Sequence, residues 1–429
     1  MSEKTADNQK VHNSVLSPQS SLLAEDSVLS PHHSLLSPQS PVLSTQSFFR
    51  REVELLLCCA RTRLDAERAA RISALLREEI DWERLLHMAH RHGMLPLLYW
   101  HLNATCPQAV PTAALSQLRD HFQANTRRNL FLTGELLQLL NLFETHRITA
   151  IPFKGPALAA SVYGNLAFRQ FADLDIFVRK QDVLRAGDLL VSLGYRPHFQ
   201  LTRGRAKAHL RSQCDLVFTR EDGRVNVELH WGIVPTYLAS PNSPRWLWKR
   251  LDRASKDGSG LPALPPEDTL LILCVHGAKH LWERLGWICD IAELIRLHRE
   301  LDWRWVMEQS RTMGGERMFY LGLFLARDLL GAPLPREVVQ RLEADPVVRE
   351  LAGQVREHLF LGRDGSPGLL ESCLFHLKAM ERLQDQMRYC VRLALTPTSG
   401  DWAFVPLPAY LSLLYYLLRP IRLAFKYGK

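Results

Sequence analysis

Residues 171–178 read Phe-Ala-Asp-Leu-Asp-Ile-Phe-Val, and this stretch decides the predicted fold. Apolar and acidic residues alternate in it, which predicts a β-strand over residues 173–178. Successive side chains of a strand point to opposite faces, so Asp173 and Asp175 share one face and the aliphatic residues share the other. The two aspartate Cα atoms would lie about 6.5–7 Å apart. Both carboxylates can therefore converge on one or two cations.

A second acidic strand is predicted at residues 225–230, in the stretch 225–231 that reads Val-Asn-Val-Glu-Leu-His-Trp. The same alternation places Glu228 and His230 on one face and the aliphatic residues in the core. If this strand pairs near the first, Glu228 becomes a third ligand. Three carboxylates on neighbouring strands can hold two metal ions for phosphoryl or nucleotidyl transfer. Oxygen ligands favour Mg²⁺ or Mn²⁺ over zinc. Taken alone, an Asp-x-Asp pair more often marks a solvated strand edge, and it is the combination that favours a metal site.

The segments around these strands predict an α+β core over residues 147–235. A strand at 148–154 and a helix at 156–163 precede the first acidic strand, and a helix over 181–193 follows it and ends at Gly194. Residues 214–219 and 225–230 flank Glu-Asp-Gly-Arg, which has the turn chemistry of a hairpin. The predicted fold is a small mixed sheet flanked by helical N- and C-terminal regions.

The remaining chain divides by composition. Residues 1–47 repeat Ser-Val-Leu-Ser-Pro-like phrases and are predicted to be a disordered tail. Residues 48–146 and 267–429 show helical periodicity, and 236–266 is predicted to be a linker. The net charge is +8, of which the tail contributes −2, so the body carries +10. A basic body suits an anionic ligand such as a nucleotide, RNA or an acidic surface.

Other features bear on location and partners. The eight cysteines show no Cys-x-x-Cys spacing, which argues against a zinc site of the usual kind and favours a reducing compartment. No secretory signal and no apolar run of the ~20 residues needed to span a membrane is found, so a cytoplasmic protein without an integral membrane segment is predicted. The amphipathic stretch at 411–426 suits a core-packing helix better than peripheral contact with a membrane surface.

The chain resembles the polymerase-beta-type nucleotidyltransferase superfamily, and more narrowly an uncharacterised bacterial branch of it. The residues that carry this resemblance extend over nearly everything after residue 48. They are Phe153-Lys154-Gly155, Tyr163, Arg169, Asp173-Leu174-Asp175, Leu193-Gly194-Tyr195, Glu228-Leu229-His230-Trp231, the run Val275–Trp282, Trp287, Asp290 and Leu418-Arg419-Pro420.

The resemblance implies roles for several of these residues. Asp173 and Asp175 match the paired metal aspartates, and Glu228 matches the third carboxylate. Gly155 stands where the superfamily has a Gly-Gly or Gly-Ser turn that offers backbone N–H groups to a triphosphate. Here Pro156 follows it, which has no N–H to give. Lys154 and Arg169 are therefore predicted to contact the nucleotide phosphates instead.

The predicted reaction moves a nucleoside monophosphate from a nucleoside triphosphate (NTP) to an acceptor hydroxyl or phosphate, with release of pyrophosphate. Glu228 would complete the metal site and help to deprotonate the nucleophile. The acceptor, whether small molecule, sugar, peptide or RNA, is open. Four residues are assigned to either substrate contact or packing: His230, His276, Lys279 and His280. The alternatives are phosphoryl transfer on the same core, or a non-catalytic module that senses nucleotides or binds a partner.

Overall fold

A computed structural model describes residues 50–199, 203–234, 247–250, 264–361, 368–397, 401, 404–405 and 414–427. The predicted tail at 1–47 lies outside these residues. So does most of the predicted linker at 236–266, of which Leu247–Arg250 is helical and Leu247 is buried. Arg250 binds Asp268, in the first turn of the following helix, at 2.8 Å.

The region before the sheet is helical, as predicted. Two of its helices begin at aspartate N-caps, because the Asp65 and Asp81 carboxylates accept hydrogen bonds from the backbone N–H groups of Arg68 and Arg84. The elements are α2 (Arg50–Cys59), α3 (Ala66–Leu75), α4 (Trp82–Arg91), α5 (Leu95–Thr105), the short 3₁₀ helix η1 (Pro107–Ala109) and α6 (Thr112–Thr145).

The central element is a five-stranded mixed sheet in the order β1-β2-β5-β4-β3. The predicted acidic strand is β2, and the predicted hairpin is β4 and β5, which pair antiparallel. β2 and β5 pair in parallel, whereas β1 and β2 pair antiparallel. The strands and the helices between them are β1 (Ala150–Pro152), α7 (Gly155–Ser161), β2 (Asp173–Val178), α8 (Val183–Ser192), β3 (Tyr195–Pro197), α9 (Arg203–Ser212), β4 (Asp215–Arg220) and β5 (Asn226–His230).

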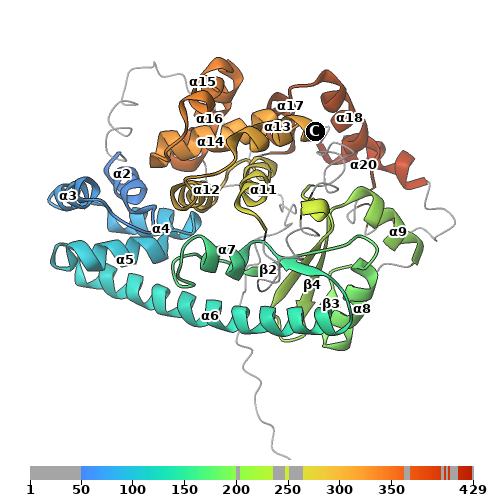
Figure 1. The fold of residues 1–429 in the computed structure, drawn as a ribbon, viewed down its shortest axis with the longest axis horizontal. Helices are drawn as coiled ribbons and strands as arrows, with labels where there is room; N and C mark the ends of the chain where they lie inside the picture. The colour runs from blue at the N-terminus through green and yellow to red at the C-terminus, as the bar shows by residue number, and fades with distance from the viewer. Residues whose placement is uncertain are drawn as a thin grey trace, which may run out of the picture. The chain divides into compact units, whose positions relative to one another are not determined.

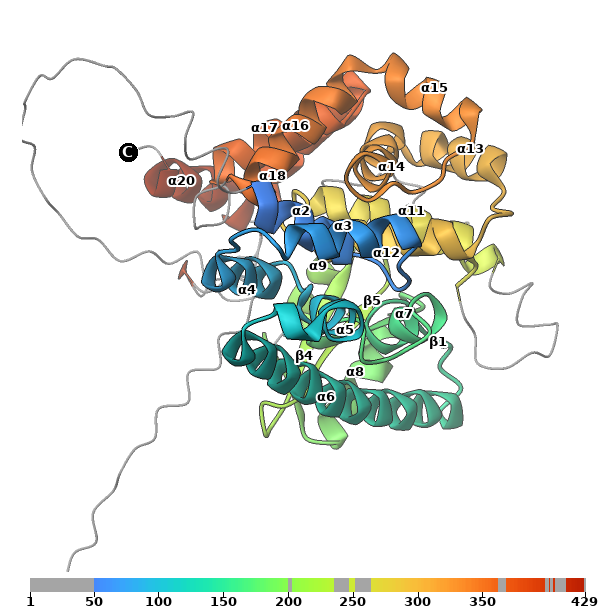
Figure 2. The ribbon, with the colours of Figure 1, turned by 90° about the vertical axis from the view of Figure 1, so that its left-hand side faces the viewer.

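The two faces of the sheet differ in chemistry. One face packs on α6 and α8 through an apolar cluster that includes Leu174, Ile176, Val227 and Leu229. Figure 1 shows α6 along this side of the sheet and α11 and α12 on the opposite side, and Figure 2 shows the same order after a quarter turn. The opposite face carries the acidic residues, so the candidate site lies between the sheet and the C-terminal helices.

The C-terminal helices share one apolar core with the N-terminal helices. This cluster joins residues of α2 to α5 with residues of α11 to α17. The helices are α11 (Pro266–Lys279), α12 (Leu285–Leu297), α13 (Trp303–Met313), α14 (Glu316–Leu330), α15 (Arg336–Ala344), α16 (Pro346–Phe360), α17 (Leu369–Ala379), α18 (Leu383–Leu395) and α20 (Tyr415–Tyr427).

A tight turn after α11 orients the helices that face the site. Leu281 and Trp282 both have positive φ angles, 53° and 56°, which residues other than glycine rarely adopt. The fully buried Trp282 indole fills the space left by Gly277 of α11 and Gly322 of α14. Only glycine fits at Gly277, because a Cβ there would lie 2.3 Å from the indole. The indole therefore sets the separation of these two helices.

The last helix, α20, contacts α18 through Arg419, whose Nε donates to the Leu393 carbonyl at 2.9 Å. Arg419 of α20 is buried and binds the Asp401 carboxylate at 2.7 Å, whereas Leu417 and Ile421 are exposed. Among the described residues, none of the helices combines the length and the apolar character that crossing a lipid bilayer requires.

Candidate active site

The pairing of β2 with β5 brings the predicted carboxylates together. Asp175 lies directly opposite Glu228 in the parallel register, and Asp173 lies opposite Asn226. The side chains opposite one another in a register share a face, so all three carboxylates emerge toward the C-terminal helices. Asp175 and Glu228 are buried, with 3% and 7% of their surface exposed, and Asp173 is partly buried.

Lys154 and His230 supply positive charge to these carboxylates. The Lys154 Nζ lies 2.6 Å from Asp175 Oδ1. The His230 Nε2 lies 3.1 Å from the same oxygen and 3.2 Å from Glu228 Oε2. The Phe153 and Phe177 rings pack edge-on against the His230 imidazole, at 5.1 and 5.8 Å between ring centroids. The sequence left His230 open between packing and substrate contact, and the structure places it inside the carboxylate cluster.

Lys154 reaches Asp175 because the chain turns tightly between β1 and α7. The Phe153 N–H donates to the Asp175 carbonyl, which holds the end of β1 against β2. Gly155 has a φ of 51°, and a Cβ there would lie 3.0 Å from the Asp173 carbonyl oxygen. This close approach and this φ angle both require glycine. Gly155 therefore permits the turn that directs Lys154 into the site.

Burial and mutual charge shift the titration of the cluster. Burial, together with the Asp175 and Glu228 carboxylates, raises the pKa of Asp173 to about 7. Burial alone would also raise the pKa of Asp175, but Lys154 and His230 hold it well below its usual range. Burial lowers the pKa of His230, yet its contacts with Asp175, Cys214 and Glu228 raise it well above its ordinary value. The imidazole is thus charged and donates its Nε2–H to both carboxylates.

The donor set fits a hard divalent cation. Carboxylate oxygens of Asp175 and Glu228 lie within 4.8 Å of each other and of a ring nitrogen of His230. Two buried carboxylates with a third, Asp173, on the same face are the oxygen donors that Mg²⁺ and Mn²⁺ prefer. The site residues therefore fit the metal that the sequence predicts, with Lys154 and His230 as the charges that balance the carboxylates.

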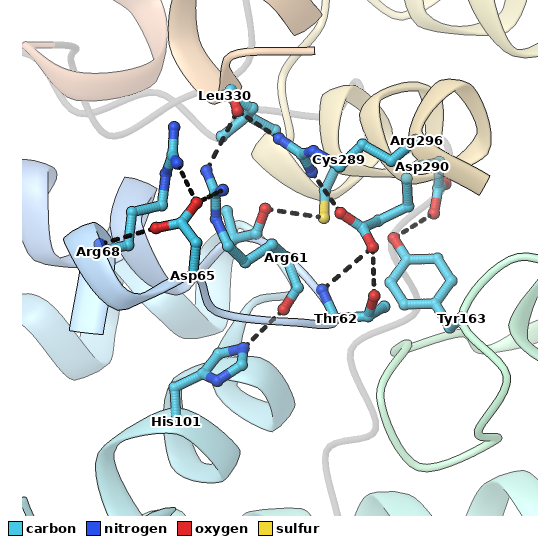
Figure 3. A network of polar contacts seen from close by, with 12 residues as sticks. Arg61, Thr62, Asp65, Arg68, His101, Tyr163, Cys289, Asp290, Arg296 and Leu330 are labelled. Carbon is cyan, nitrogen blue, oxygen red and sulfur yellow. Dashed lines mark hydrogen bonds and ion pairs between the residues drawn. The ribbon is translucent and has the colours of Figure 1, made fainter. Parts of the chain in front are cut away.

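Arg169 lies near the carboxylates but is bound to another helix. Its Nε and Nη2 donate to the two oxygens of Asp290 on α12, at 2.8 and 2.9 Å. The Tyr163 hydroxyl also donates to Asp290, at 2.7 Å. Figure 3 shows Tyr163 meeting Asp290, and beside it Arg296 and Arg61 converging on the Leu330 carbonyl. The contact of Arg169 with phosphate stays a prediction, and the structure adds a positioning role between α7, β2 and α12.

The end of α11 forms the wall opposite the carboxylates. The His276 and His280 rings lie 4.8 Å apart and both pack against Trp287, at 5.2 and 5.4 Å between centroids. Burial, with the nearby Lys154 and Lys279 charges, lowers the pKa of both histidines well below its ordinary value. They are therefore neutral beside a charged site. Lys279 Nζ lies 3.9 Å from Asp215 Oδ2 on β4.

Comparison with known proteins agrees with this geometry. A sequence profile of a family described as uncharacterised nucleotidyltransferases matches residues 78–331, more than half of the chain. The chain belongs to this family. The matched segment begins just before α4 and ends just after α14, so it contains the carboxylates and the Arg169–Asp290 pair. No curated protein and no solved structure matches the chain.

Sequence reasoning missed two polar residues of this candidate site. Asp215 pairs with His230 in the β4–β5 register, and Cys214 precedes it. Both sit at the predicted start of the hairpin, and the alternation of β4 places Asp215 on the same face as Glu228 through the register. The alternation along β4 could have placed Asp215 on the acidic face, but only if the register of the β4–β5 hairpin had been known.

Proposed function

We propose that the chain transfers a nucleoside monophosphate from an NTP to a hydroxyl or phosphate of an acceptor, releasing pyrophosphate, with Mg²⁺ or Mn²⁺ bound at Asp173, Asp175 and Glu228. The observation that carries this proposal is the in-register pairing of Asp175 with Glu228 on adjacent parallel strands, with Asp173 on the same face. Family membership supports nucleotidyl transfer in general.

The side chains around the carboxylates suit a phosphate-bearing substrate. When bound, the divalent cation supplies charge neutralisation of the reacting phosphate. Lys154, released from Asp175, reaches the same region and can bind phosphate oxygens as a point charge. The neutral His276 and His280 can donate or accept hydrogen bonds without adding charge. Lys279 provides a further cation at the β4 side of the site.

The first test is calorimetric binding of each of the four NTPs with Mg²⁺. Asp175→Asn keeps the side-chain size and removes the charge, and it should weaken binding at least tenfold. Asp222→Asn is the matched control, because Asp222 lies in the exposed β4–β5 turn and binds Arg220 at the end of β4 and the backbone N–H of Arg224, away from the carboxylates. Thermal unfolding of both variants shows whether they fold. Equal NTP affinity in wild type and a folded Asp175→Asn variant would contradict the proposal.

The product separates nucleotidyl transfer from its rivals. NTP labelled on the α-phosphate transfers label to the acceptor if the nucleotidyl group moves, whereas label on the γ-phosphate moves in phosphoryl transfer. Candidate acceptors of each class, sugar, peptide, RNA and small molecule, are presented in turn. Metal-dependent NTP binding with neither label transferred to any of them would favour the nucleotide-sensing module.

A further inference from the structure

A second set of metal-ligating atoms lies beside the carboxylates. It comes from Cys214 and Asp215 at the start of β4 and from His230 at the end of β5. A ring nitrogen of His230, the Cys214 Sγ and a carboxylate oxygen of Asp215 all lie within 4.8 Å of one another. Cys214 and His230 are buried, and Asp215 is partly buried. The proposed transfer reaction gives Cys214 and Asp215 no role.

The two nitrogens of His230 face different surroundings. Nε2 donates to the Asp175 and Glu228 carboxylates. Nδ1 is buried, in a residue that is only 5% exposed, and it makes no hydrogen bond of ordinary geometry among the described residues. The Cys214 thiol, which contacts the ring, is itself one of the three candidate ligands. A buried polar atom without a partner costs about 1–3 kcal/mol in most proteins, so it calls for an explanation.

This arrangement is the one that metal-binding histidines adopt. A histidine that binds a metal through one nitrogen usually donates the other N–H to a carboxylate, which fixes the ring. Here Asp175 and Glu228 already hold Nε2, so Nδ1 is the nitrogen that is left for a cation, which would displace the Nδ1 proton of the charged imidazole. The ring is further fixed by the Phe153 and Phe177 contacts.

The spacing of sulfur and oxygen also fits. A tetrahedral zinc ion with Zn–S of about 2.3 Å and Zn–O of about 2.1 Å places the two ligand atoms about 3.6 Å apart. Cys214 Sγ lies 3.6 Å from Asp215 Oδ2. A thiolate, an imidazole and a carboxylate are the three ligand types that zinc uses, and the thiolate disfavours Mg²⁺.

We propose that Cys214, Asp215 and His230 Nδ1 bind a divalent cation of the Zn²⁺ class, next to the Mg²⁺ carboxylates and separate from them. The site has three protein ligands, which leaves the fourth position of a tetrahedral ion for water or a substrate atom. Its ligands come from two paired strands rather than from a Cys-x-x-Cys loop, so cysteine spacing could not reveal it. Lys279 neutralises Asp215 from 3.9 Å in the metal-free protein and competes with the cation.

The test is a titration of the chelator-treated, full-length protein with Co²⁺, a zinc substitute whose thiolate complex absorbs in the near ultraviolet. The expected result is a thiolate-to-cobalt band that saturates at one equivalent and disappears when Zn²⁺ is added. Cys214→Ser should abolish the band and weaken Zn²⁺ binding at least tenfold. Cys390→Ser, which removes the exposed thiol on α18, is the matched control and should leave both unchanged. Lys279→Gln should tighten Zn²⁺ binding several-fold, because it removes the competing charge.

Several outcomes would overturn the proposal: no thiolate band in wild type, a band that survives Cys214→Ser, or equal losses in both cysteine variants. Asp215→Asn provides a second variant if Cys214→Ser is unstable, and unchanged Zn²⁺ affinity in a folded Asp215→Asn protein would also count against the site. The titration contains neither nucleotide nor Mg²⁺. A failure of the proposed transferase reaction therefore leaves its result intact, and the reverse also holds.

Discussion

Replacing Gly277 with alanine tests how the Trp282 indole holds α11 against α14. A Cβ at Gly277 would meet three indole carbons at 2.3, 2.4 and 2.5 Å. Favourable carbon contacts lie at about 3.5–4.0 Å, so the ring would have to move by about 1 Å. It has little room to do so, because Trp282 is fully buried and its Cη2, one of these three carbons, also lies 3.0 Å from the Cβ position of Gly322.

Two opposing effects set the change in the free energy of unfolding that Gly277→Ala should cause. Overpacking a core costs about 1–3 kcal/mol, and a fixed indole places this case at the upper end. Alanine in place of glycine inside a helix stabilises the helix by about 1 kcal/mol. Gly277→Ala should therefore destabilise the protein by about 2 kcal/mol. Gly353→Ala in α16 is the matched control, because no atom lies within 4 Å of its Cβ position, and it should stabilise the protein by about 0.5–1 kcal/mol.

Urea unfolding followed by circular dichroism measures both changes. A Gly277→Ala protein as stable as wild type would refute the reasoning. Trp282→Leu provides a further check, since the shorter side chain removes the clash. The cost of Gly277→Ala should then largely disappear in the Trp282→Leu background, a non-additivity expected of residues in direct contact.

Three further predictions concern the polar groups. Lys154→Met should strengthen the binding of Mn²⁺ alone by about tenfold, because Lys154 competes with the cation for Asp175, and it should weaken NTP binding. Affinities for Mn²⁺ and NTP that change in the same direction would contradict a Lys154 that leaves Asp175 for the phosphates. Tyr163→Phe removes a hydrogen bond to the Asp290 carboxylate and should cost about 1.5–3 kcal/mol in urea unfolding, and no loss would show that Arg169 alone holds Asp290. His92 is buried and neutral, and burial lowers its pKa to about 4 from an ordinary 6.5, so the free energy of unfolding should fall by about 3 kcal/mol as the pH falls from 6.5 to 4. A His92→Gln variant should lack this part of the pH dependence, and parallel curves of unfolding free energy against pH for variant and wild type would refute the prediction.

The fold of the core was largely predictable because alternation is a local signal. The strand at 173–178 has the boundaries that its alternation predicts, and the hairpin forms around the expected turn. The same alternation placed Asp173, Asp175 and Glu228 on one face. The short strand β3 and helix α9 were not predicted, because β3 has only three residues and α9 lacks a clear apolar stripe.

Which residues far apart in the sequence contact one another in the fold could not be predicted. Arg169 binds Asp290 across 121 residues of sequence, and nothing near either residue indicates the other. The sequence predicts a third ligand at Glu228 only if the two acidic strands pair, and it does not show that β2 and β5 pair in parallel, because tertiary packing sets the register between strands. The Lys154–Asp175 contact likewise depends on the turn at Gly155, whose positive φ is a property of the folded chain.

The charges of the site indicate that metal and nucleotide bind together. Buried ion pairs stabilise a fold poorly compared with apolar packing, so three carboxylates and two cations in this place are better explained by a ligand than by stability. Asp175 and Glu228 are balanced by Lys154 and His230, and burial, with the neighbouring carboxylates, raises the pKa of Asp173 to about 7. A divalent cation that enters alone therefore leaves an excess of positive charge in a buried place. A triphosphate removes that excess and gives the displaced Lys154 a new partner. Binding of Mn²⁺ should consequently tighten when NTP is present, and by linkage NTP binding should tighten by the same factor when Mn²⁺ is present.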